Sequence, residues 1–394
     1  MSSAIFLDQQ RAKTLIAKHG SPLYVYDLNA LENRAKELLR YCQSLSCTPR
    51  YAIKANPHRD IIKLFSRLDL HFDASSDYEA DEAIAAGVHP AKISLSSQQP
   101  PRDMKKTLQS GIKFVATSFH QLGIVEQTGW KDNIAVRLNP GLGTGHNRRT
   151  TTGGITSSFG IWHEYIPEVL DWQSKSGINI NRVHIHIGSG GDSKIWRTAI
   201  RLSLELIQQL PSVEILNMGG GYKIARLEDE KSADIGRIII IFGSEIKNFA
   251  TRTGRKLRLE IEPGTWLVGN AGLLLSRIVD IVDTGKNGFN FIKLDSGMND
   301  LLRPAMYGAQ HEVKILNDSI KTADYVVVGH NCETGDIFTP APGDPEAIKP
   351  RKLNRASIGD LVVVGGAGAY GASMRAVGYN SFPSAAEIFI NGSR

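Results

Sequence analysis

The chain has 394 residues, of which 41% are hydrophobic and 22% are charged, values that exclude a disordered or collagen-like protein. Its 46 basic and 40 acidic residues leave a net charge of +6 without a long basic run, which argues against nucleic-acid binding and suits an anionic cofactor or substrate. A chain of this length exceeds the usual size of one core, so two domains or one elaborated barrel are expected.

Short β-branched or apolar runs predict eight β-strands in the first two thirds of the chain. They cover residues 50–53, 70–74, 92–95, 113–116, 134–138, 182–187, 213–216 and 257–261. Apolar residues with helical spacing lie between them, for example at 59–66, 77–86 and 194–209. This alternation predicts an α/β fold with a (β/α)8 barrel of the TIM type, and an open, doubly wound parallel sheet is the alternative.

The pattern changes after about residue 273, where strands follow one another without long helices. The predicted strands cover residues 276–282, 289–294, 312–316, 325–328, 360–364 and 386–390, and the Pro-rich segment 339–350 is expected to be a surface loop. The sequence therefore predicts a barrel over residues 28–273 and a mostly antiparallel β-domain over 1–27 and 274–394.

Chemically capable residues stand where several of the predicted barrel strands end. The active site of such a barrel forms at the carboxyl ends of its strands, so these residues are expected to share one rim. They are Lys54 in YAIKAN, Asp73 in FDASS, His186 in HIHIGSGG, the triplet Gly219, Gly220 and Gly221, and Glu262 in EPG.

Lys54 is the candidate nucleophile of this rim. Apolar strand residues precede it, so partial desolvation would favour the unprotonated amine that Schiff-base chemistry needs, unless the side chain simply reaches solvent. The glycine triplet exposes backbone N–H groups where such barrels bind phosphate, although three glycines also make an ordinary turn. A covalent amine and an anion site on one rim together predict pyridoxal phosphate as the cofactor.

Two further side chains fit this cofactor. Glu262 would pair with the pyridine nitrogen and keep the ring able to accept electrons, or else would form a salt bridge that closes the barrel. His186 would stack on the ring, or else would be a hydrogen-bonded core histidine.

Six motifs follow one another along the chain: YAIKAN, HIHIGSGG, GGGY, EPG, CETGD (332–336) and GAYGASM (368–374). Their order over about residues 22–390 resembles the pyridoxal-phosphate-dependent decarboxylases of the alanine-racemase fold, also called fold type III. Within these, the resemblance is greatest to the diaminopimelate decarboxylases. It implies the conversion of meso-2,6-diaminopimelate to L-lysine and carbon dioxide.

The resemblance implies a role for each matching residue. Lys54 would hold the cofactor as a Schiff base, His186 would stack on its ring and Glu262 would bind the ring nitrogen. The other cofactor-binding residues would be Ser189, Gly220, Gly221, Gly264, Thr265 and Tyr370 around the phosphate end, with Asp73, Glu79 and Arg137 bracing the lysine or the phenolic side of the ring.

The resemblance also assigns the catalytic acid and the substrate site. Cys332 would reprotonate the α-carbon from the partner subunit, so a homodimer with shared active sites is expected; a small buried hydrophobe is the alternative. Arg303 and Tyr307, four residues apart, would hold the distal carboxylate of the substrate, and Glu333 would take the distal ammonium. Tyr370 would also bind the substrate.

The chain departs from the family pattern at a few positions. The usual Glu-Pro-Gly-Arg ends here in Thr265, which keeps a hydroxyl but loses the charge, and Ser381, Phe382 and Pro383 replace an Arg-rich segment. Arg148 and Arg149 would compensate for the missing charge, or would form a solvated basic loop.

The remaining features concern compartment and alternatives. Cys42, Cys47 and Cys332 have no metal-ligand spacing, and their odd number favours a reducing compartment, the cytoplasm. Neither an export segment nor about 18 consecutive apolar residues is present, so no membrane association is expected. Two alternatives stay open: a decarboxylase of another basic amino acid (ornithine, lysine or arginine) or of a related biosynthetic intermediate, and a non-catalytic pyridoxal-phosphate-binding paralogue.

Overall fold

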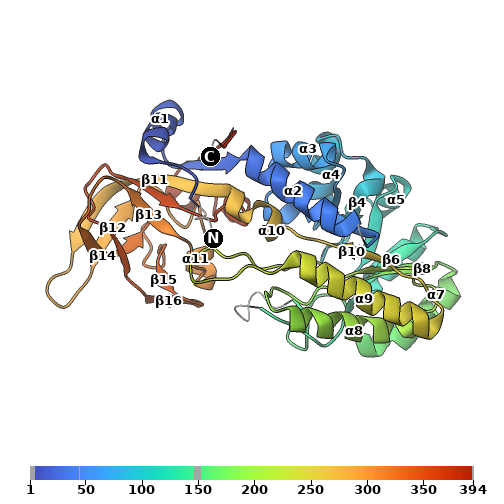
Figure 1. Cartoon of the computed structure of the whole chain (residues 1–394). Coiled ribbons are helices and arrows are strands. Elements are labelled where there is room, and N and C mark those ends of the chain that lie inside the picture. The colour runs from blue at the N-terminus through green and yellow to red at the C-terminus, as the bar shows by residue number, and fades with distance from the viewer. Residues whose placement is uncertain (1–4, 44, 146–151, 393–394) are drawn as a thin grey trace. The chain divides into compact units, whose positions relative to one another are not determined.

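The computed structural model of the chain describes residues 5–43, 45–145 and 152–392 (Figure 1). The chain divides into two compact units. The barrel unit comprises residues 32–223 and 232–264, and the β-unit comprises residues up to 31, 224–231 and 265 onward. The predicted domain ranges, 28–273 for the barrel and 1–27 with 274–394 for the β-domain, stay a prediction.

The barrel unit contains the eight predicted strands in a closed ring. They are β2 (Cys47–Ala52), β3 (His71–Ala74), β4 (Ile93–Leu95), β5 (Lys113–Ala116), β6 (Ile134–Asn139), β8 (Ile180–His184), β9 (Ile215–Asn217) and β10 (Arg258–Ile261). Neighbouring strands pair in parallel in the order β5-β4-β3-β2-β10-β9-β8-β6, and β6 pairs with β5 to close the ring. The predicted barrel is confirmed, and the open sheet is excluded.

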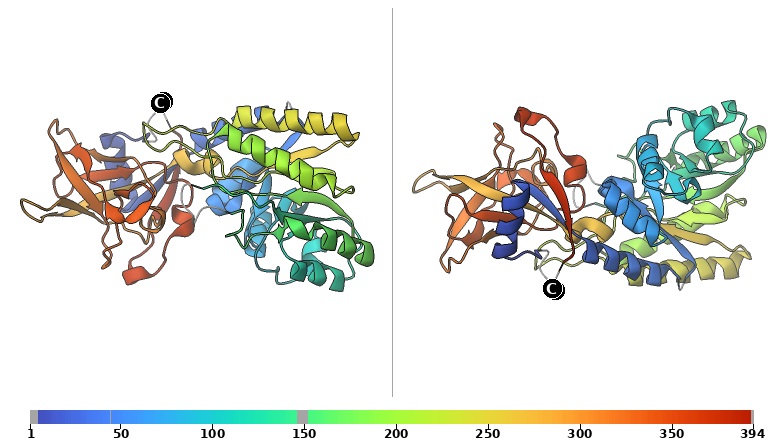
Figure 2. Two further views of the ribbon diagram at one scale, coloured as in Figure 1. Left: turned by 90° about the horizontal axis from the view of Figure 1, so that it is seen from below. Right: turned by 90° about the horizontal axis from the view of Figure 1, so that it is seen from above.

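Helices follow the barrel strands and cover the outside of the ring. They are α3 (Arg59–Arg67), α4 (Asp77–Ala85), α5 (Met104–Gln109), α6 (Phe119–Gln127), α7 (Ile166–Ser176), α8 (Ser193–Gln208) and α9 (Ile235–Thr253), while α2 (Leu28–Gln43) precedes β2, and the short β7 (Ile161–Trp162) extends from β6. Helices α8 and α9 lie side by side (Figures 1 and 2). Asp192 and Asp234 cap their first turns by accepting backbone N–H groups.

The β-unit is built around one branched sheet. Its strands are β1 (Leu23–Asp27), β11 (Gly272–Asp283), β12 (Asn290–Leu294), β13 (Val313–Leu316), β14 (Thr322–Val328), β17 (Arg351–Asn354), β18 (Leu361–Val364) and β19 (Ala386–Ile390). Only β1 with β19 and β12 with β14 pair in parallel among the described strands of this sheet. The expected mostly antiparallel β-domain is therefore confirmed.

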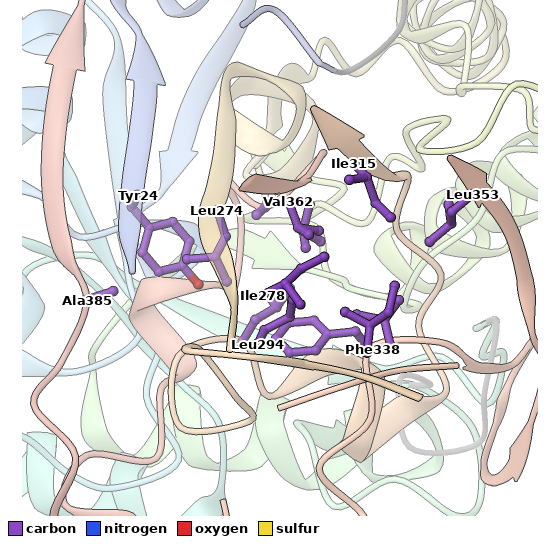
Figure 3. Close-up of a cluster of buried hydrophobic side chains, with 14 of the residues drawn as sticks. Tyr24, Leu274, Ile278, Leu294, Ile315, Phe338, Leu353, Val362 and Ala385 are labelled. Atoms are coloured by element: carbon purple, nitrogen blue, oxygen red, sulfur yellow. The ribbon is translucent and has the colours of Figure 1, made fainter. Parts of the chain in front are cut away.

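The strands of the β-unit bury side chains on both faces, because successive residues of a strand point in opposite directions. Tyr24 and Tyr26 of β1 belong to one apolar cluster, whereas Leu23 and Val25 belong to another. Figure 3 shows the first cluster, with members from β1, β11, β12, β13, β17 and β18. The second packs against α1 (Gln9–His19), whose Ala12 and Ile16 are buried.

The Pro-rich segment 339–350 is not the plain loop that its composition predicts. Strands β15 (Pro340–Ala341) and β16 (Asp344–Ile348) pair as a short hairpin. The turn between them contains Pro342 and Gly343, and Gly343 has a φ of +74°. Proline followed by glycine between two short strands is a turn pattern, which the loop prediction overlooked.

Two short helices complete the β-unit, α10 (Thr265–Val268) and α11 (Arg303–Tyr307). Among the described residues, no helix has both the length and the apolar character needed to cross a membrane. The described ranges also contain no group of three or more His, Cys, Asp or Glu residues placed to hold a metal ion.

Candidate active site

Lys54 lies just beyond the carboxyl end of β2, in the single 3-10 turn Ile53–Ala55. Its Nζ is 3.8 Å from Oδ2 of Asp73, which belongs to the neighbouring strand β3, and its side chain is 40% exposed. Gly264 packs directly against this turn, because a Cβ added to it would lie 2.9 Å from Cβ of Ala55. The amine therefore stands on the barrel rim, held beside an acid and more accessible than the sequence led us to expect.

Asp73 is completely buried beneath this amine. Its Oδ1 accepts a hydrogen bond of 3.4 Å from Ser96, while its Oδ2 has no hydrogen-bond partner in the described part of the chain. Burial, together with the nearby charge of Glu262, raises the pKa of Asp73 to about 8, and Lys54 opposes this rise. Burial thus favours the protonated carboxyl group of Asp73, whereas the cationic amine of Lys54 favours its ionised form.

Glu79 takes part in the start of α4. Its backbone N–H donates to Ser76 Oγ, and its Oε2 accepts from the backbone N–H of Ser75 at 2.7 Å. This arrangement is a variant of the helix capping box. Glu79 therefore has a structural role here, and the bracing of Lys54 implied by the resemblance stays a prediction.

The glycine triplet is packed against the neighbouring loops of the rim. A Cβ on Gly221, whose φ is +99°, would lie 1.7 Å from the carbonyl oxygen of Gly188, and one on Gly220 would lie 2.2 Å from that of Glu262. The N–H of Gly219 donates to Asn217 Oδ1 and that of Gly220 to His186 Nδ1. Close packing therefore requires glycine, and two of the three amides already serve internal hydrogen bonds.

His186 lies directly beside this triplet. Because the N–H of Gly220 donates to its Nδ1, we assign the ring proton to Nε2. Burial, reinforced by the positive charges of Arg137 and Lys54, holds the pKa of His186 well below its usual range. The imidazole ring of His186 is therefore neutral and fixed in orientation, which suits stacking on a flat ligand. Ser189, the residue after Gly188, donates its backbone N–H to the carbonyl oxygen of Thr144.

Glu262 directly follows β10 and is held by two polar neighbours. Its Oε1 accepts from Asn217 Nδ2 at 2.5 Å, and its Oε2 is 3.1 Å from Nε2 of His184. Burial acts to raise the pKa of Glu262, but His184, Lys54 and Arg182 outweigh it and lower that pKa below its usual value. The rim thus contains an ionised carboxylate of fixed orientation.

The β-unit contains the residues predicted for the proton donor and the substrate. Cys332 is an exposed free thiol, unlike the buried Cys42 and Cys47, so the alternative of a small core residue is wrong. Its backbone N–H donates to Asn380 Oδ1 at 2.7 Å. Its neighbour Glu333 accepts from the hydroxyl of Tyr379 at 3.4 Å.

The turn that holds Cys332 is fixed from beneath by buried polar groups. Asp336 Oδ2 accepts from the backbone N–H and the side chain of Asn331, and its Oδ1 accepts from the backbone N–H of Met298 at 2.7 Å. A Cβ on Gly297 or Gly329 would collide with the Asp336 carboxylate. The thiol is therefore presented on a rigid turn.

The predicted pair Arg303 and Tyr307 forms the two ends of α11. Nη1 of Arg303 approaches the carbonyl oxygen of Ala369 at 3.5 Å. Tyr370, the next residue, has a φ of +54°, a left-handed conformation that is costly for a tyrosine and marks a position fixed by its surroundings. Thr265 is the first residue of α10. Arg148 and Arg149 lie outside the described residues.

Residues 28–269 match the family described as pyridoxal-dependent decarboxylase, pyridoxal binding domain. The chain belongs to this family.

Relatives of this pyridoxal-dependent decarboxylase match along almost its whole length. It is 33% identical to the diaminopimelate decarboxylase of Streptomyces coelicolor, over 98% of this chain and 88% of that protein. It is 31% identical to that of Escherichia coli K12, over 96% of this chain and 91% of that protein. The predicted family is thereby confirmed.

Solved structures of relatives have the same fold. A crystal structure of diaminopimelate decarboxylase matches with a TM-score of 0.89 at 27% identity, covering 100% of this chain and 96% of that chain. That of the Helicobacter pylori enzyme complexed with L-lysine matches with a TM-score of 0.83 at 26% identity, covering 96% and 93%.

Pyridoxal phosphate is the cofactor of this decarboxylase family, and the barrel rim fits it. Lys54 offers an accessible amine, and Glu262 a fixed anion for the ring nitrogen. Asp73 Oδ2 and Arg137 Nη2 are buried polar atoms without hydrogen-bond partners in the described chain. Such atoms are costly unless a ligand satisfies them, so the rim is complete only with a polar ligand.

The structure brings together the predicted residues of the barrel and adds some that sequence reasoning missed. His184 orients Glu262, and the pattern His-Ile-His could have shown it, because alternate strand residues share a face. Arg50, Arg182 and Glu260 form a buried charged layer inside the barrel. Charged residues within short apolar strands were the available clue.

Proposed function

We propose that this decarboxylase converts meso-2,6-diaminopimelate to L-lysine and carbon dioxide. The observation that carries the proposal is the rim where the accessible amine of Lys54 stands beside Asp73 while the ionised Glu262 is held by Asn217 and His184. The choice of substrate is supported by the relatives named diaminopimelate decarboxylase and by Arg303 and Tyr307 on α11.

Each side chain has a chemical task in this proposal. When bound, pyridoxal phosphate would supply an electron sink for the pair left on the α-carbon as the carbon–carboxylate bond breaks and carbon dioxide leaves. Lys54 holds the cofactor through Nζ, and Glu262 keeps a proton on the pyridine nitrogen. The neutral ring of His186 orients the cofactor from one face. Cys332 Sγ then donates a proton to the α-carbon and regains one from solvent.

The substrate's far end is an amino acid in its own right, and charged side chains suit it. Arg303 is assigned to the distal carboxylate with Tyr307 and Tyr370, and Glu333 to the distal ammonium. Ser189, Gly220, Gly221, Gly264 and Thr265 are assigned to the phosphate end of the cofactor. A decarboxylase of another basic amino acid is the second candidate, because Thr265 lacks the charge that the family usually has at this position.

The test is to incubate the purified protein and pyridoxal phosphate with meso-diaminopimelate, L-ornithine, L-lysine and L-arginine, measuring carbon dioxide and identifying products by mass spectrometry. We expect L-lysine from meso-diaminopimelate and no comparable turnover of the others. Lys54→Ala should abolish activity, whereas the exposed Lys63→Ala, a matched control on α3, should retain it. Turnover of only one of the other amino acids would support the second candidate. Turnover of none of the four substrates would support the non-catalytic paralogue.

The cofactor assignment has an independent test. Borohydride reduction of the holoenzyme followed by peptide mapping should place the pyridoxyl group on Lys54. A label on a different lysine would contradict the assignment whatever the substrate is.

The active enzyme is proposed to be a cytoplasmic homodimer with shared sites. Lys54 and Cys332 belong to different units of the chain, the thiol is exposed, and free thiols suit a reducing compartment. Mixing inactive Lys54→Ala and Cys332→Ala dimers should restore about a quarter of wild-type activity, because about half of the dimers are mixed and each has one intact site. No gain, once subunit exchange is verified by mass spectrometry, would show that each site is made by one chain.

A further inference from the structure

Three basic side chains of the β-unit gather against a single loop, residues 365–369. Arg226 Nε donates to the carbonyl oxygen of Gly366 at 3.1 Å, and Arg303 Nη1 approaches that of Ala369 at 3.5 Å. His311 Nδ1 is 2.9 Å from the carbonyl oxygen of Gly365. We call Arg226, Arg303 and His311 the basic cluster. Its members come from three separate segments of the chain.

The basic cluster has more donor capacity than the chain uses. Arg226 Nη2 is buried without a hydrogen-bond partner among the described residues. The acidic neighbour Glu230 uses Oε2 to accept the backbone N–H groups of Arg226 and Leu227. Burial and the charge of Arg303 hold the pKa of Arg226 well below its usual range. Leaving a buried guanidinium N–H group without an acceptor costs free energy, and an anionic ligand that bound Arg226 Nη2 would remove this cost.

His311 belongs to the basic cluster by position but is uncharged. Its Nδ1 faces a carbonyl oxygen and therefore carries the ring proton. Burial, followed by the charges of Arg226 and Arg303, holds the pKa of His311 well below its usual range. The positive charge of the cluster thus lies on the two guanidinium groups.

The segment that holds Arg226 packs against the helix that begins at Thr265. A Cβ on Gly269 would lie 2.3 Å from Ile224 Cδ1 and 3.4 Å from Thr265 Cγ2. Asn270 Nδ2 donates to the carbonyl oxygen of Ala225 at 2.9 Å. Residues 224–226 therefore lie beside the place where the family usually has an arginine and this chain has Thr265.

We propose that Arg226, with Arg303, binds the distal carboxylate of the substrate and supplies the charge that Thr265 lacks. The inference rests on the proposed function, because it assigns a further residue to the same substrate. Two guanidinium groups that meet at one loop suit a carboxylate, which accepts hydrogen bonds through both oxygens. Arg226 replaces Arg148 and Arg149 as the residue that compensates for the substitution at position 265.

The test compares two ligands of the holoenzyme that differ only in this carboxylate, L-lysine and 1,5-diaminopentane, by calorimetry. Arg226→Met should weaken L-lysine binding about ten-fold or more and change diaminopentane binding less than about two-fold, because a charge-assisted hydrogen bond is lost. Arg226→Lys should show an intermediate loss. Arg277→Met is the matched control, since exposed Arg277 likewise donates to a glycine carbonyl, that of Gly359, and should leave both affinities unchanged.

A rescue separates a binding role from a structural one. Arg226→Met/Thr265→Arg should recover most of the lost L-lysine affinity, because it returns a guanidinium group to the helix start. Unchanged L-lysine binding in Arg226→Met, or equal loss of both ligands without rescue, would overturn the proposal. If Arg226→Met does not fold, Arg226→Lys and Arg226→Gln give the same comparison.

Two further measurements, cofactor affinity and carbon dioxide release, separate this proposal from a phosphate-binding role of Arg226 and from failure of the proposed function. Weaker pyridoxal phosphate binding with unchanged preference for L-lysine over diaminopentane would assign Arg226 to the phosphate and overturn the proposal. Failure of wild-type protein to release carbon dioxide from meso-diaminopimelate would refute the proposed function, while the two-ligand comparison would still decide whether Arg226 binds a carboxylate.

Discussion

Two regions, one buried in the barrel and one half-buried in the β-unit, contain the same charged groups, two arginines and one glutamate, in opposite arrangements. Inside the barrel, Arg50 donates to both oxygens of Glu260 at 3.0 and 2.7 Å, and Arg182 Nη2 is 2.5 Å from Oε2. In the β-unit, Glu230 turns an oxygen to backbone N–H groups, and Arg226 Nη2 has no partner within the described chain. In the barrel layer both arginines have their counter-charge in Glu260, although Arg182 Nε has no hydrogen-bond partner among the described residues, whereas in the basic cluster an oxygen of Glu230 is used by backbone N–H groups.

Burial of charge alone therefore does not mark a functional site. A buried carboxylate between two guanidinium groups resembles a site by composition, yet its hydrogen bonds are used inside the fold. A guanidinium group that no carboxylate of the described chain binds is the better guide to recognition. The comparison predicts that changes in the barrel layer affect stability and that changes in the basic cluster affect binding.

The largest expected effect is that of Glu260→Gln. It leaves Arg50 and Arg182 buried without their counter-charge, so the unfolding free energy of the barrel should fall by about 3–5 kcal/mol. Urea unfolding followed by tryptophan fluorescence measures this. Glu214→Gln is the control, because its contact with Arg258 is exposed, and its midpoint should not move. Equal midpoints for Glu260→Gln and wild type would show that the barrel layer does not stabilise the fold.

The same carboxylate predicts an acid dependence. Burial acts to raise the pKa of Glu260, but Arg182 and Arg50 outweigh it and lower that pKa to about 2. Because the folded pKa is lower than the unfolded one, the stabilisation is complete above about pH 4.5 and is lost as the pH falls towards 2. It amounts to roughly 3 kcal/mol. The difference in stability between wild type and Glu260→Gln should shrink over this interval; a constant difference would contradict the pairing.

A smaller effect, on function alone, is expected from Arg303→Ala. Loss of a charged hydrogen bond of roughly 1.5–3 kcal/mol should lower kcat/KM for meso-diaminopimelate about ten-fold or more. Pyridoxal phosphate affinity and the urea midpoint should stay close to those of wild type and of Arg277→Ala. A lower urea midpoint with unchanged kcat/KM would show that Arg303 stabilises the fold, as the barrel layer does, and does not bind the substrate.

The barrel could be predicted because each of its strands is a short apolar run flanked by helical spacing. The same reasoning found Lys54, Asp73, His186 and Glu262, since strand ends in such a barrel share one rim. It failed for β1, Leu23–Asp27, whose pairing partners lie in distant parts of the chain. Local patterns do not show such partners.

Arg226 shows a different limit. It lies between β9 and α9 in a segment without regular structure, and its meaning depends on Gly366, 140 residues further along the chain. Nothing in the local sequence distinguishes it from a solvated arginine. Such a residue is found only when the hydrogen-bond partners of each buried polar atom are known from the structure.

The pairing of β1 also has a consequence for synthesis of the chain. Leu23 of β1 lies beside Leu275 of β11 and Ala386 of β19, so its second partner is made about 360 residues later. At roughly 5–20 residues per second, a ribosome needs about 20 to 70 s for that distance. During this interval the barrel strands can assemble from near neighbours, whereas β1 has no partner until β11 is made and lacks β19 until the interval ends. The edge of β1 that pairs with β19 is therefore the strand edge of this sheet that stays unpaired longest during synthesis.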